Sequence, residues 1–406
     1  MSDRPEQVPW KQRFLAPTIL LPAWAQNAPD RLVYASSESG SFQMYSWDLA
    51  SGRRVRMTDE SVGVTEGCPT HDGRGLLWFQ DDSGDEVGRW MVKPFGEPEA
   101  AARPFAPGIP DAWGTGLALG RDIAVVGTSD RDAYTVWLAR PDAEPVALHR
   151  HEQFVGVGRE WTISAGGLSS DGDLVCLCHA EHGDVSHLAL RVVDLEGATV
   201  DEQHDEGMHL IAAAWSPAPG DRRLAIVHER TGFERPALWD PARRQLEDLP
   251  LDLEGSVDVA DWWPDASALL LLQELDGRNR LHRFDLATGS CTPIEHREGT
   301  ISSARVRPDG TVWMRVQNGA TPPTILSGGD LLIAPDAEPA PAGRAYASFE
   351  FRNPGGDRIH GFVVEPEGQR PHPLVMEVHG GPQASWKDSS APPSSLWSTT
   401  GTRSRW

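Results

Sequence analysis

Cysteine is scarce in this chain, with four residues among 406, and these are too few and too scattered for a disulfide framework. Cys176 and Cys178 lie two positions apart in an apolar run, so we expect them on one face of a strand as buried, reduced thiols. A metal site built on them would need further ligands at compatible spacing, and the sequence supplies none. We therefore expect no metal site and no cofactor.

Basic residues are also in deficit. There are 37 lysines and arginines against 59 acidic residues, which gives a formal net charge of −22 at pH 7. An acidic chain repels phosphate backbones, so nucleic acid is not an expected partner, and solubility is the simplest explanation of the charge. No run approaches the roughly 18 consecutive apolar residues that a membrane helix needs, so no membrane partner is expected.

One apolar run near the start resembles an export signal. Residues 14–25 (FLAPTILLPAWA) follow Lys11 and Arg13 and end in Ala23-Trp24-Ala25, which resembles a small-residue cleavage site. Asp3 and Glu6 lie upstream and two prolines interrupt the run, and both features oppose that interpretation. The sequence therefore favours a cytoplasmic protein with reduced thiols, and export is the alternative.

Long helices are excluded by composition, since 40 glycines and 33 prolines interrupt the chain too often. An aliphatic or β-branched run recurs seven times instead, at spacings of 43 to 51 residues. The runs are LVYASS from Leu32, LLWFQ from Leu76, IAVVG from Ile123, LVCLC from Leu174, LAIVH from Leu224, LLLLQ from Leu269 and VWMRV from Val312. Short strands that repeat at this distance are typical of a propeller or an array, whose units bury their faces against their neighbours.

We therefore expect a mainly β fold in which residues 23–333 form a seven-bladed β-propeller. The third and seventh repeats are the least regular, so six or eight blades are the alternatives. Two repeats carry a Trp-Asp pair, Trp47-Asp48 and Trp239-Asp240, which is a feature of WD40 repeats. The pair is missing from the other repeats, so we interpret it as a strand-ending aromatic residue before a turn-forming Asp.

The pattern changes after the last repeat. The alternating Ala and Pro of residues 334–344 (APDAEPAPAGR) predict a linker, and residues 1–22 are expected to form an N-terminal segment. Within residues 345–388, the sequences ASFEF, IHGFVVEP and PLVMEVHGGP predict three strands. The last is a continuous apolar run that enters a glycine turn, which is typical of a buried strand in an α/β sheet.

That turn is His379-Gly380-Gly381-Pro382. Two glycines after a central strand let the backbone approach a substrate closely and direct N–H groups outward, where they can stabilise the oxyanion of an acyl-transfer intermediate. In α/β-hydrolases the loop after the third strand supplies one such donor. A plain tight turn is the alternative, because glycine turns after strands are common.

A propeller, a linker, an extended segment and then VHGGP together resemble the prolyl oligopeptidase family of serine peptidases, in its acylaminoacyl peptidase or dipeptidyl aminopeptidase type. The resemblance implies a propeller that caps an α/β-hydrolase domain, a central tunnel that admits short peptides as substrates, and a Ser, Asp and His triad. It also implies that the Gly381 N–H is an oxyanion donor and that His379 and Gly380 shape the oxyanion loop.

The sequence departs from this family at the nucleophile. No G-x-S-x-G occurs, so there is no nucleophile elbow, and the triad Asp and His would follow that elbow in the chain. Residues 389–406 show neither helical nor strand periodicity. If the reading frame of the codons for residues 396–406 is shifted by two bases, the codons permit an amino-acid sequence typical of this family. Our hypothesis is therefore a frameshift in the gene near the codon of Ser389 or Ser390. A genuine short tail is the alternative.

We therefore expect residues 345–388 to be the first strands of an incomplete α/β-hydrolase domain, residues 389–406 to be an aberrant tail, and the chain to be inactive alone. A noncatalytic propeller that binds peptides or proteins at its axial opening is the main alternative, and a carboxylesterase is a weaker one. Glu160 and Glu229 are candidates for binding the free amino terminus of a substrate, although a solvated surface carboxylate is more common.

Overall fold

The computed structural model describes residues 9–159, 162–366, 368, 371–380 and 385–390, with the backbone of 403–405. Among these residues there is a single short helix, α1 (Pro9–Leu15), and every other regular element is a strand. The expectation of a mainly β chain is confirmed. No helix in the described part of the chain is both long and apolar enough to cross a lipid bilayer.

Between residues 23 and 203 the strands follow one another as antiparallel groups of four, which we call units 1 to 4. Unit 1 consists of β1 (Ala23–Ala25), β2 (Ala28–Ser36), β3 (Gln43–Asp48) and β4 (Arg53–Arg56). Unit 2 consists of β5 (Gly67–Pro69), β6 (Gly75–Asp81), β7 (Val87–Pro94) and β8 (Arg103–Pro104). Unit 3 consists of β9 (Ala112–Leu119), β10 (Ala124–Ser129), β11 (Tyr134–Ala139) and β12 (Val146–His151). Unit 4 consists of β13 (Val155–Val157), β14 (Leu174–His179), β15 (Ala189–Asp194) and β16 (Thr199–Gln203).

The same arrangement continues to residue 333 as units 5 to 7. Unit 5 consists of β17 (Leu210–Trp215), β18 (Leu224–His228), β19 (Arg235–Asp240) and β20 (Gln245–Asp248). Unit 6 consists of β21 (Ser256–Trp262), β22 (Ala268–Leu275), β23 (Arg278–Asp285) and β24 (Cys291–Ile294). Unit 7 consists of β25 (Thr300–Val306), β26 (Val312–Gln317), β27 (Thr324–Ser327) and β28 (Asp330–Ile333). Units 2 and 3 also pair edge to edge, through β7 and β9, and so share one eight-stranded sheet.

Each recurring apolar run of the sequence is the second strand of a unit. All six residues of β14 and all five of β18 are buried. A strand that is covered on both faces has no polar side to show, which is why these runs are continuous rather than alternating. The expected pair Cys176 and Cys178 lies in β14, where both residues are buried in one hydrophobic cluster and form no disulfide, and burial raises the pKa of Cys176 well above its ordinary value.

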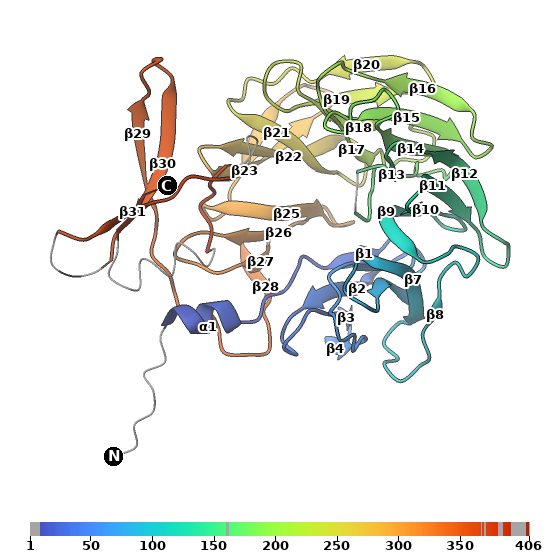
Figure 1. Ribbon diagram of the computed structural model, residues 1–406, viewed down its shortest axis with the longest axis horizontal. Coiled ribbons are helices and arrows are strands. Elements are labelled where there is room, and N and C mark those ends of the chain that lie inside the picture. The colour runs from blue at the N-terminus through green and yellow to red at the C-terminus, as the bar shows by residue number, and fades with distance from the viewer. Residues whose placement is uncertain are drawn as a thin grey trace.

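The units pack face to face around a common centre, in the order of their colours in Figure 1. Among the described residues, seven buried hydrophobic clusters each join one unit to the next. One of these clusters combines side chains of unit 1 with side chains of unit 7. The chain of contacts therefore returns to its beginning, which is consistent with a propeller.

Side chains rather than a shared strand join the two ends of this ring. Trp313 of β26 lies 5.7 Å from Trp24, edge to face, and 6.5 Å from the nearly parallel ring of Trp47, measured between ring centroids. Arg307 places its guanidinium 4.7 Å above the Trp313 ring and donates a hydrogen bond of 2.7 Å to the Pro29 carbonyl. Aromatic and cation–π contacts thus stabilise the interface between the last and first units.

A smaller sheet follows residues 334–344. Its strands are β29 (Ala347–Arg352), β30 (Arg358–Val364), β31 (Leu374–Met376) and β32 (Arg403–Arg405), arranged in the order β29-β30-β32-β31. β32 pairs parallel to β31 and antiparallel to β30. Residues 403–405, within the expected tail, thus form a short strand by backbone pairing, although the tail shows no side-chain periodicity.

β31 is not buried in this chain, although its apolar run is typical of a buried strand. Its apolar side chains lie open, with Leu374 53% exposed and Met376 74% exposed, and Val378 just beyond it is 74% exposed. The physical reason is that no described helix covers either face of this small sheet, which extends from the ring at one side (Figure 1). The apolar pattern of a strand shows that it can pack against other apolar surfaces. Among the described residues, no such surface covers β31.

The residues before β1 belong to the same body. Ile19 bridges to Ser36 of β2 and is only 4% exposed, so this part of the early apolar run contributes to the core of unit 1. Farther back, the Arg13 Nε of α1 donates a hydrogen bond of 2.9 Å to the Pro341 carbonyl. The N-terminal helix and the segment that leads to the small sheet are thus attached to each other.

Candidate functional site

The expected oxyanion loop begins directly after β31. His379 and Gly380 are exposed, whereas Gly381 lies outside the described residues, together with the neighbouring positions 382–384. A Cβ placed on Gly380 would meet nothing within 4 Å, so no packing contact requires glycine there. The structure therefore leaves the role of these three residues as a prediction, on a turn that is open to solvent.

The chain then returns to the ring, where Asp388 is almost completely buried. Its Oδ1 accepts a hydrogen bond of 2.8 Å from the Gly319 N–H, and its Oδ2 accepts one of 2.9 Å from Arg278 Nε. Its main chain is bound as well, because its N–H donates to the Gly277 carbonyl and its carbonyl accepts from Thr300 Oγ1. Every polar group of this residue is thus used to attach residues 385–390 to units 6 and 7.

Arg278, at the start of β23, connects this segment to the small sheet. Its Nη1 donates to Ser348 Oγ at 3.1 Å, and its Nη2 donates to the Tyr346 carbonyl at 3.3 Å. The guanidinium also lies 5.2 Å from the centre of the Phe362 ring, which is 1% exposed. One side chain of the ring therefore contacts three separate segments of the C-terminal part, and the planar fork of Arg suits it to such multiple donation.

The turn between β22 and β23 carries a second ion pair. Arg358 of β30 donates two hydrogen bonds to the Asp276 carboxylate, at 2.8 and 2.6 Å, and a third to Glu350 of β29. Hydrogen bonding to this guanidinium lowers the pKa of both carboxyl groups. Ion pairs between exposed side chains contribute little to stability. We therefore expect this pair to fix the orientation of the small sheet rather than to add much to the free energy of unfolding.

Gly277 completes this turn, which we call the docking turn (residues 276–278). Asp276 and Gly277 both have positive φ angles, 54° and 69°, as a tight hairpin turn requires. A Cβ on Gly277 would come within 2.4 Å of the Trp386 carbonyl oxygen and 2.7 Å of the Phe362 ring. Glycine is therefore required here both for its backbone conformation and for the close approach of the C-terminal segment.

A hollow of about 470 Å³ lies beside the docking turn. Its lining comes from β23 and β24 on the ring side and from β29 and β30 on the other side, and includes Arg280, His296, Ser348, Glu350 and His360. Burial lowers the pKa of His360, so this imidazole is neutral near pH 7. The contact between ring and small sheet is accordingly polar and partly open rather than a packed apolar interface.

A larger cavity, of about 880 Å³, lies between units 1, 2 and 3. Its wall includes four aromatic side chains, Phe42, Phe79, Trp90 and Trp113, and three carboxylates, of which Glu66 is one. Burial raises the pKa of Glu66 above its ordinary value. An apolar wall with an acidic group is suited to a ligand that carries a positive charge next to an apolar side chain.

Glu229, one of the two glutamates proposed from sequence, is not among the described residues that line this cavity. Glu160 lies outside the described residues, and Glu229 accepts a hydrogen bond of 3.1 Å from the His209 N–H, so it orders the backbone between units 4 and 5. Glu66 was missed because it precedes a short strand in an unremarkable sequence, GVTEGCP, which carries no signal of a cavity.

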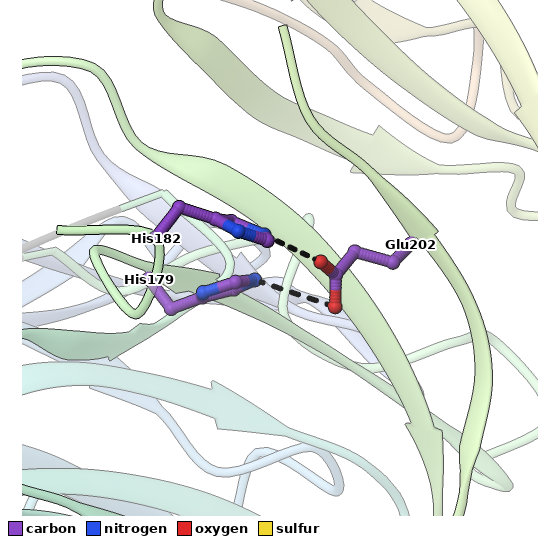
Figure 2. A group of neighbouring side chains, drawn as sticks. All are labelled: His179, His182 and Glu202. Carbon is purple, nitrogen blue, oxygen red and sulfur yellow. Dashed lines mark hydrogen bonds and ion pairs between the residues drawn. The ribbon is translucent and has the colours of Figure 1, made fainter. Parts of the chain in front are cut away.

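A group of possible metal ligands lies elsewhere, in unit 4. His179, His182 and Glu202 bring three ligand atoms within 4.8 Å of one another (Figure 2). Burial lowers the pKa of His179 to about 4, so its imidazole is neutral at neutral pH. In the sequence, only the His-x-x-His spacing of His179 and His182, directly after the LVCLC run, points to this group. Glu202 lies 20 residues after His182, so sequence spacing does not link it to the two histidines.

Comparisons with known proteins agree with the fold. No protein-family model matches the chain. A stretch of 111 residues, 25% of the chain, is 28% identical to dipeptidyl-peptidase 5 of Schizosaccharomyces pombe and corresponds to 15% of that protein.

Two solved structures are similar over 98% of this chain. A prolyl endopeptidase structure superposes with a TM-score of 0.74 at 13% identity, and an acylaminoacyl peptidase in complex with Z-Gly-Gly-Phe-chloromethyl ketone superposes with a TM-score of 0.69 at 12% identity. The chain spans 62% and 66% of those two chains, respectively. Identities this low show the fold alone. Together with the curated relative, they agree with the resemblance to the prolyl oligopeptidase family drawn from the sequence.

Proposed function

We propose that this chain is the substrate-gating propeller of a serine peptidase that hydrolyses short peptides, together with the first strands of its α/β-hydrolase domain. One observation carries the proposal: a ring of four-stranded sheets is attached, through Asp388 and Arg278, to a small mixed sheet whose strand β31 runs into the His379-Gly380 turn. The likeness to the prolyl endopeptidase and acylaminoacyl peptidase structures supports it.

The ring is best understood as seven blades. Seven four-stranded units and seven shared hydrophobic clusters in the described residues support this count, although units 2 and 3 also join edge to edge. A closed ring leaves a central passage, and in a peptidase such a passage would limit access to short peptides.

The small sheet has the features of an incomplete hydrolase sheet. β31 is an apolar strand that runs into the His379-Gly380 turn, as in the parallel sheet of an α/β-hydrolase, whereas β32 belongs to the tail that we expect to be aberrant and adds no support. Sheets with parallel strands are normally covered on both faces, and the exposed Leu374, Met376 and Val378 are suited to such a cover. These features support the proposal that further hydrolase elements belong on this sheet in the complete enzyme.

In that enzyme a serine would attack the peptide carbonyl, a histidine would transfer its proton, and the Gly381 N–H would help to stabilise the oxyanion. The 406 residues contain no G-x-S-x-G, so we propose that this chain alone has no peptidase activity. The test is an assay of purified, untagged 1–406 with fluorogenic acylaminoacyl and aminoacyl substrates, and with a fluorophosphonate probe for reactive serines. We expect no turnover and no labelling.

Fluorophosphonate-sensitive turnover would overturn the proposed inactivity, because it would place a complete triad within these residues. Sequencing the gene beyond the codon of Ser389 tests the frameshift separately. We expect an open frame that encodes G-x-S-x-G, and a frame without that motif contradicts the peptidase assignment. Cytoplasmic location is also our proposal, supported by four cysteines that form no disulfide.

A noncatalytic peptide-binding propeller is the second candidate, and the cavity of about 880 Å³ with Glu66 favours it. Calorimetric titration with short peptides would test it, with Glu66→Gln as the probe and Glu152→Gln, an exposed position, as the control. Binding that needs Glu66 and a free peptide amino terminus supports a binding role. Equal binding by both variants argues against this cavity as the site.

A further inference from the structure

Three side chains of unit 4 converge outside the proposed peptidase machinery. His179 is the last residue of β14, His182 lies in the hairpin between β14 and β15, and Glu202 lies in β16 (Figure 2). The His182 Nε2 is 2.6 Å from Glu202 Oε1, and the His179 Nε2 is 3.8 Å from Glu202 Oε2. Antiparallel pairing produces this convergence, since β15 lies between the strands that carry His179 and Glu202.

His179 is the unusual member of the group. Its side chain is completely buried, and its Nε2 has no hydrogen-bond partner, although it points toward Glu202 (Figure 2). Buried polar atoms without partners are rare, because each loses its interaction with water and gains nothing in return. The lack of a partner for His179 Nε2 is explained if this nitrogen binds a ligand from outside the protein.

We propose that His179, His182 and Glu202 bind a divalent first-row transition-metal ion, with zinc as the representative. Two imidazoles and one carboxylate form a ligand set that suits zinc, and three protein ligands leave a fourth position for water. Zinc–ligand bonds of about 2.0–2.2 Å separate neighbouring donors by roughly 3.3 Å. The three ligand atoms lie within 4.8 Å of one another, so the more distant of them must move closer together to reach that value.

The surrounding charges favour a cation. Arg191 donates from Nε to Glu202 Oε2 at 2.5 Å and from Nη1 to Glu181 Oε2 at 2.7 Å, so one guanidinium faces two carboxylates. This leaves a net negative charge and keeps Glu202 Oε1 available as a ligand while Arg191 fixes the other oxygen. The remaining oxygen of Glu181 is occupied by His149 Nε2, at 2.6 Å. Partners that hold a ligating carboxylate in this way are common around metal ions.

The tautomer of His179 must be compatible with the ion. Binding through Nε2 puts the proton on Nδ1, which now receives only a long contact of 3.4 Å from the Glu181 N–H. Loss of this contact is a small cost compared with a metal–nitrogen bond. His182 provides the route of entry, because 39% of its side chain is exposed and its ring stacks on His204 at 3.8 Å.

The site would join the β14–β15 hairpin to β16, and it is independent of the His379 turn.

The experiment uses untagged 1–406, stripped with EDTA and dialysed into metal-free buffer. Zinc chloride is titrated calorimetrically, and Co²⁺ is added separately to record the visible absorption of a tetrahedral complex. We expect one zinc ion per chain, a higher melting temperature with zinc, and a tetrahedral Co²⁺ spectrum.

The variants His182→Ala and Glu202→Gln each remove one ligand, and we expect each to weaken zinc binding by at least about tenfold. His187→Ala is the matched control, because His187 lies in the same hairpin but pairs with Asp184. Zinc binding by the control should equal that of the wild type. Melting curves without metal establish that each variant is folded.

Two results would overturn the proposal. One is wild-type protein that binds no zinc and gives only the octahedral, hydrated Co²⁺ spectrum. The other is binding that His182→Ala and Glu202→Gln leave unchanged, or that His187→Ala weakens equally, since the zinc would then occupy other histidines. The wild-type spectrum decides the matter even if neither variant folds.

Discussion

The carboxylate of Asp388 and the guanidinium of Arg278 lie 2.9 Å apart, although 110 residues separate them in the sequence. Asp388 belongs to the segment that follows the His379-Gly380 turn, and Arg278 belongs to the docking turn of the ring. The side chain of Asp388 is 6% exposed and that of Arg278 is 24% exposed, so the pair is shielded from solvent. It is one of several contacts through which the ring holds the chain that leaves the predicted oxyanion loop.

Replacing Arg278 by Ala tests how strongly this contact attaches the two parts. The change leaves a buried carboxylate without its cation, which destabilises such pairs by about 3 kcal/mol. We expect the amide hydrogens of Gly319 and Asp388, which donate to Asp388 Oδ1 and the Gly277 carbonyl, to exchange much faster with solvent. Hydrogen exchange measured by mass spectrometry would detect this change.

Arg280→Ala is the matched control for that experiment. Arg280 lies two residues farther along β23 and is exposed, and its replacement removes the same charge from the same strand. Protection at Gly319 and Asp388 should remain as in the wild type. If both variants lose protection from hydrogen exchange equally, the positive charge of β23 in general, rather than the contact of Arg278 with Asp388, holds residues 385–390 on the ring.

Gly277→Ala tests the close approach at the docking turn. Both Gly277 and Gly289 have positive φ angles, 69° and 68°, but only the Gly277 position is crowded by Trp386 and Phe362. Strain at the positive φ should cost each variant about 1 kcal/mol of unfolding free energy. We expect a further loss in Gly277→Ala, together with faster hydrogen exchange in residues 385–390. Equal denaturation midpoints and equal exchange in the two variants would contradict the crowding argument.

Trp313→Ala tests whether the ring is closed. Trp313 is 4% exposed and packs on unit 1, so its truncation should lower the free energy of unfolding by about 3 to 5 kcal/mol, as for other buried tryptophans. Trp239→Ala, at the interface of units 4 and 5, provides the comparison. Urea denaturation should give losses of similar size. A much smaller loss for Trp313→Ala would show that units 1 and 7 are not packed against each other in solution.

The ring was predictable from the sequence because its second strands are buried on both faces. Runs such as those of β14 and β18 stand out in a chain so rich in glycine and proline. The turn aspartates after Trp47 and Trp239 were predictable for the same local reason, and the side chains of Asp48 and Asp240 accept hydrogen bonds from the N–H groups of Ser51 and Arg243.

The contacts between distant parts could not be predicted. Arg278 and Asp388 belong to no periodic pattern, and only the three-dimensional arrangement brings them together. Glu202 likewise meets His179 because β16 pairs with β15 in a register that sets Arg191 opposite Glu202. The apolar run of β31 shows what this strand can pack against, and its exposure follows because the described residues of 345–388 include no helix that could cover it.

Acid should destabilise the ring through His282 of β23. This imidazole is 6% exposed and donates from Nε2 to Gln273 Oε1 at 2.9 Å, and burial, with smaller effects of Arg280 and His296, lowers its pKa below 6.5. As the pH is lowered, the unfolded chain therefore takes up a proton before the folded chain does. The free energy of unfolding falls as the pH drops from about 6.5 toward the folded pKa, by about 1.4 kcal/mol for each unit by which the folded pKa lies below the unfolded one. His282→Gln keeps the hydrogen bond to Gln273 but cannot be protonated. Urea denaturation at pH 5 and pH 7.5 should show a smaller acid-induced loss in the variant, whereas equal losses would mean that His282 is already protonated in the folded protein or is solvated.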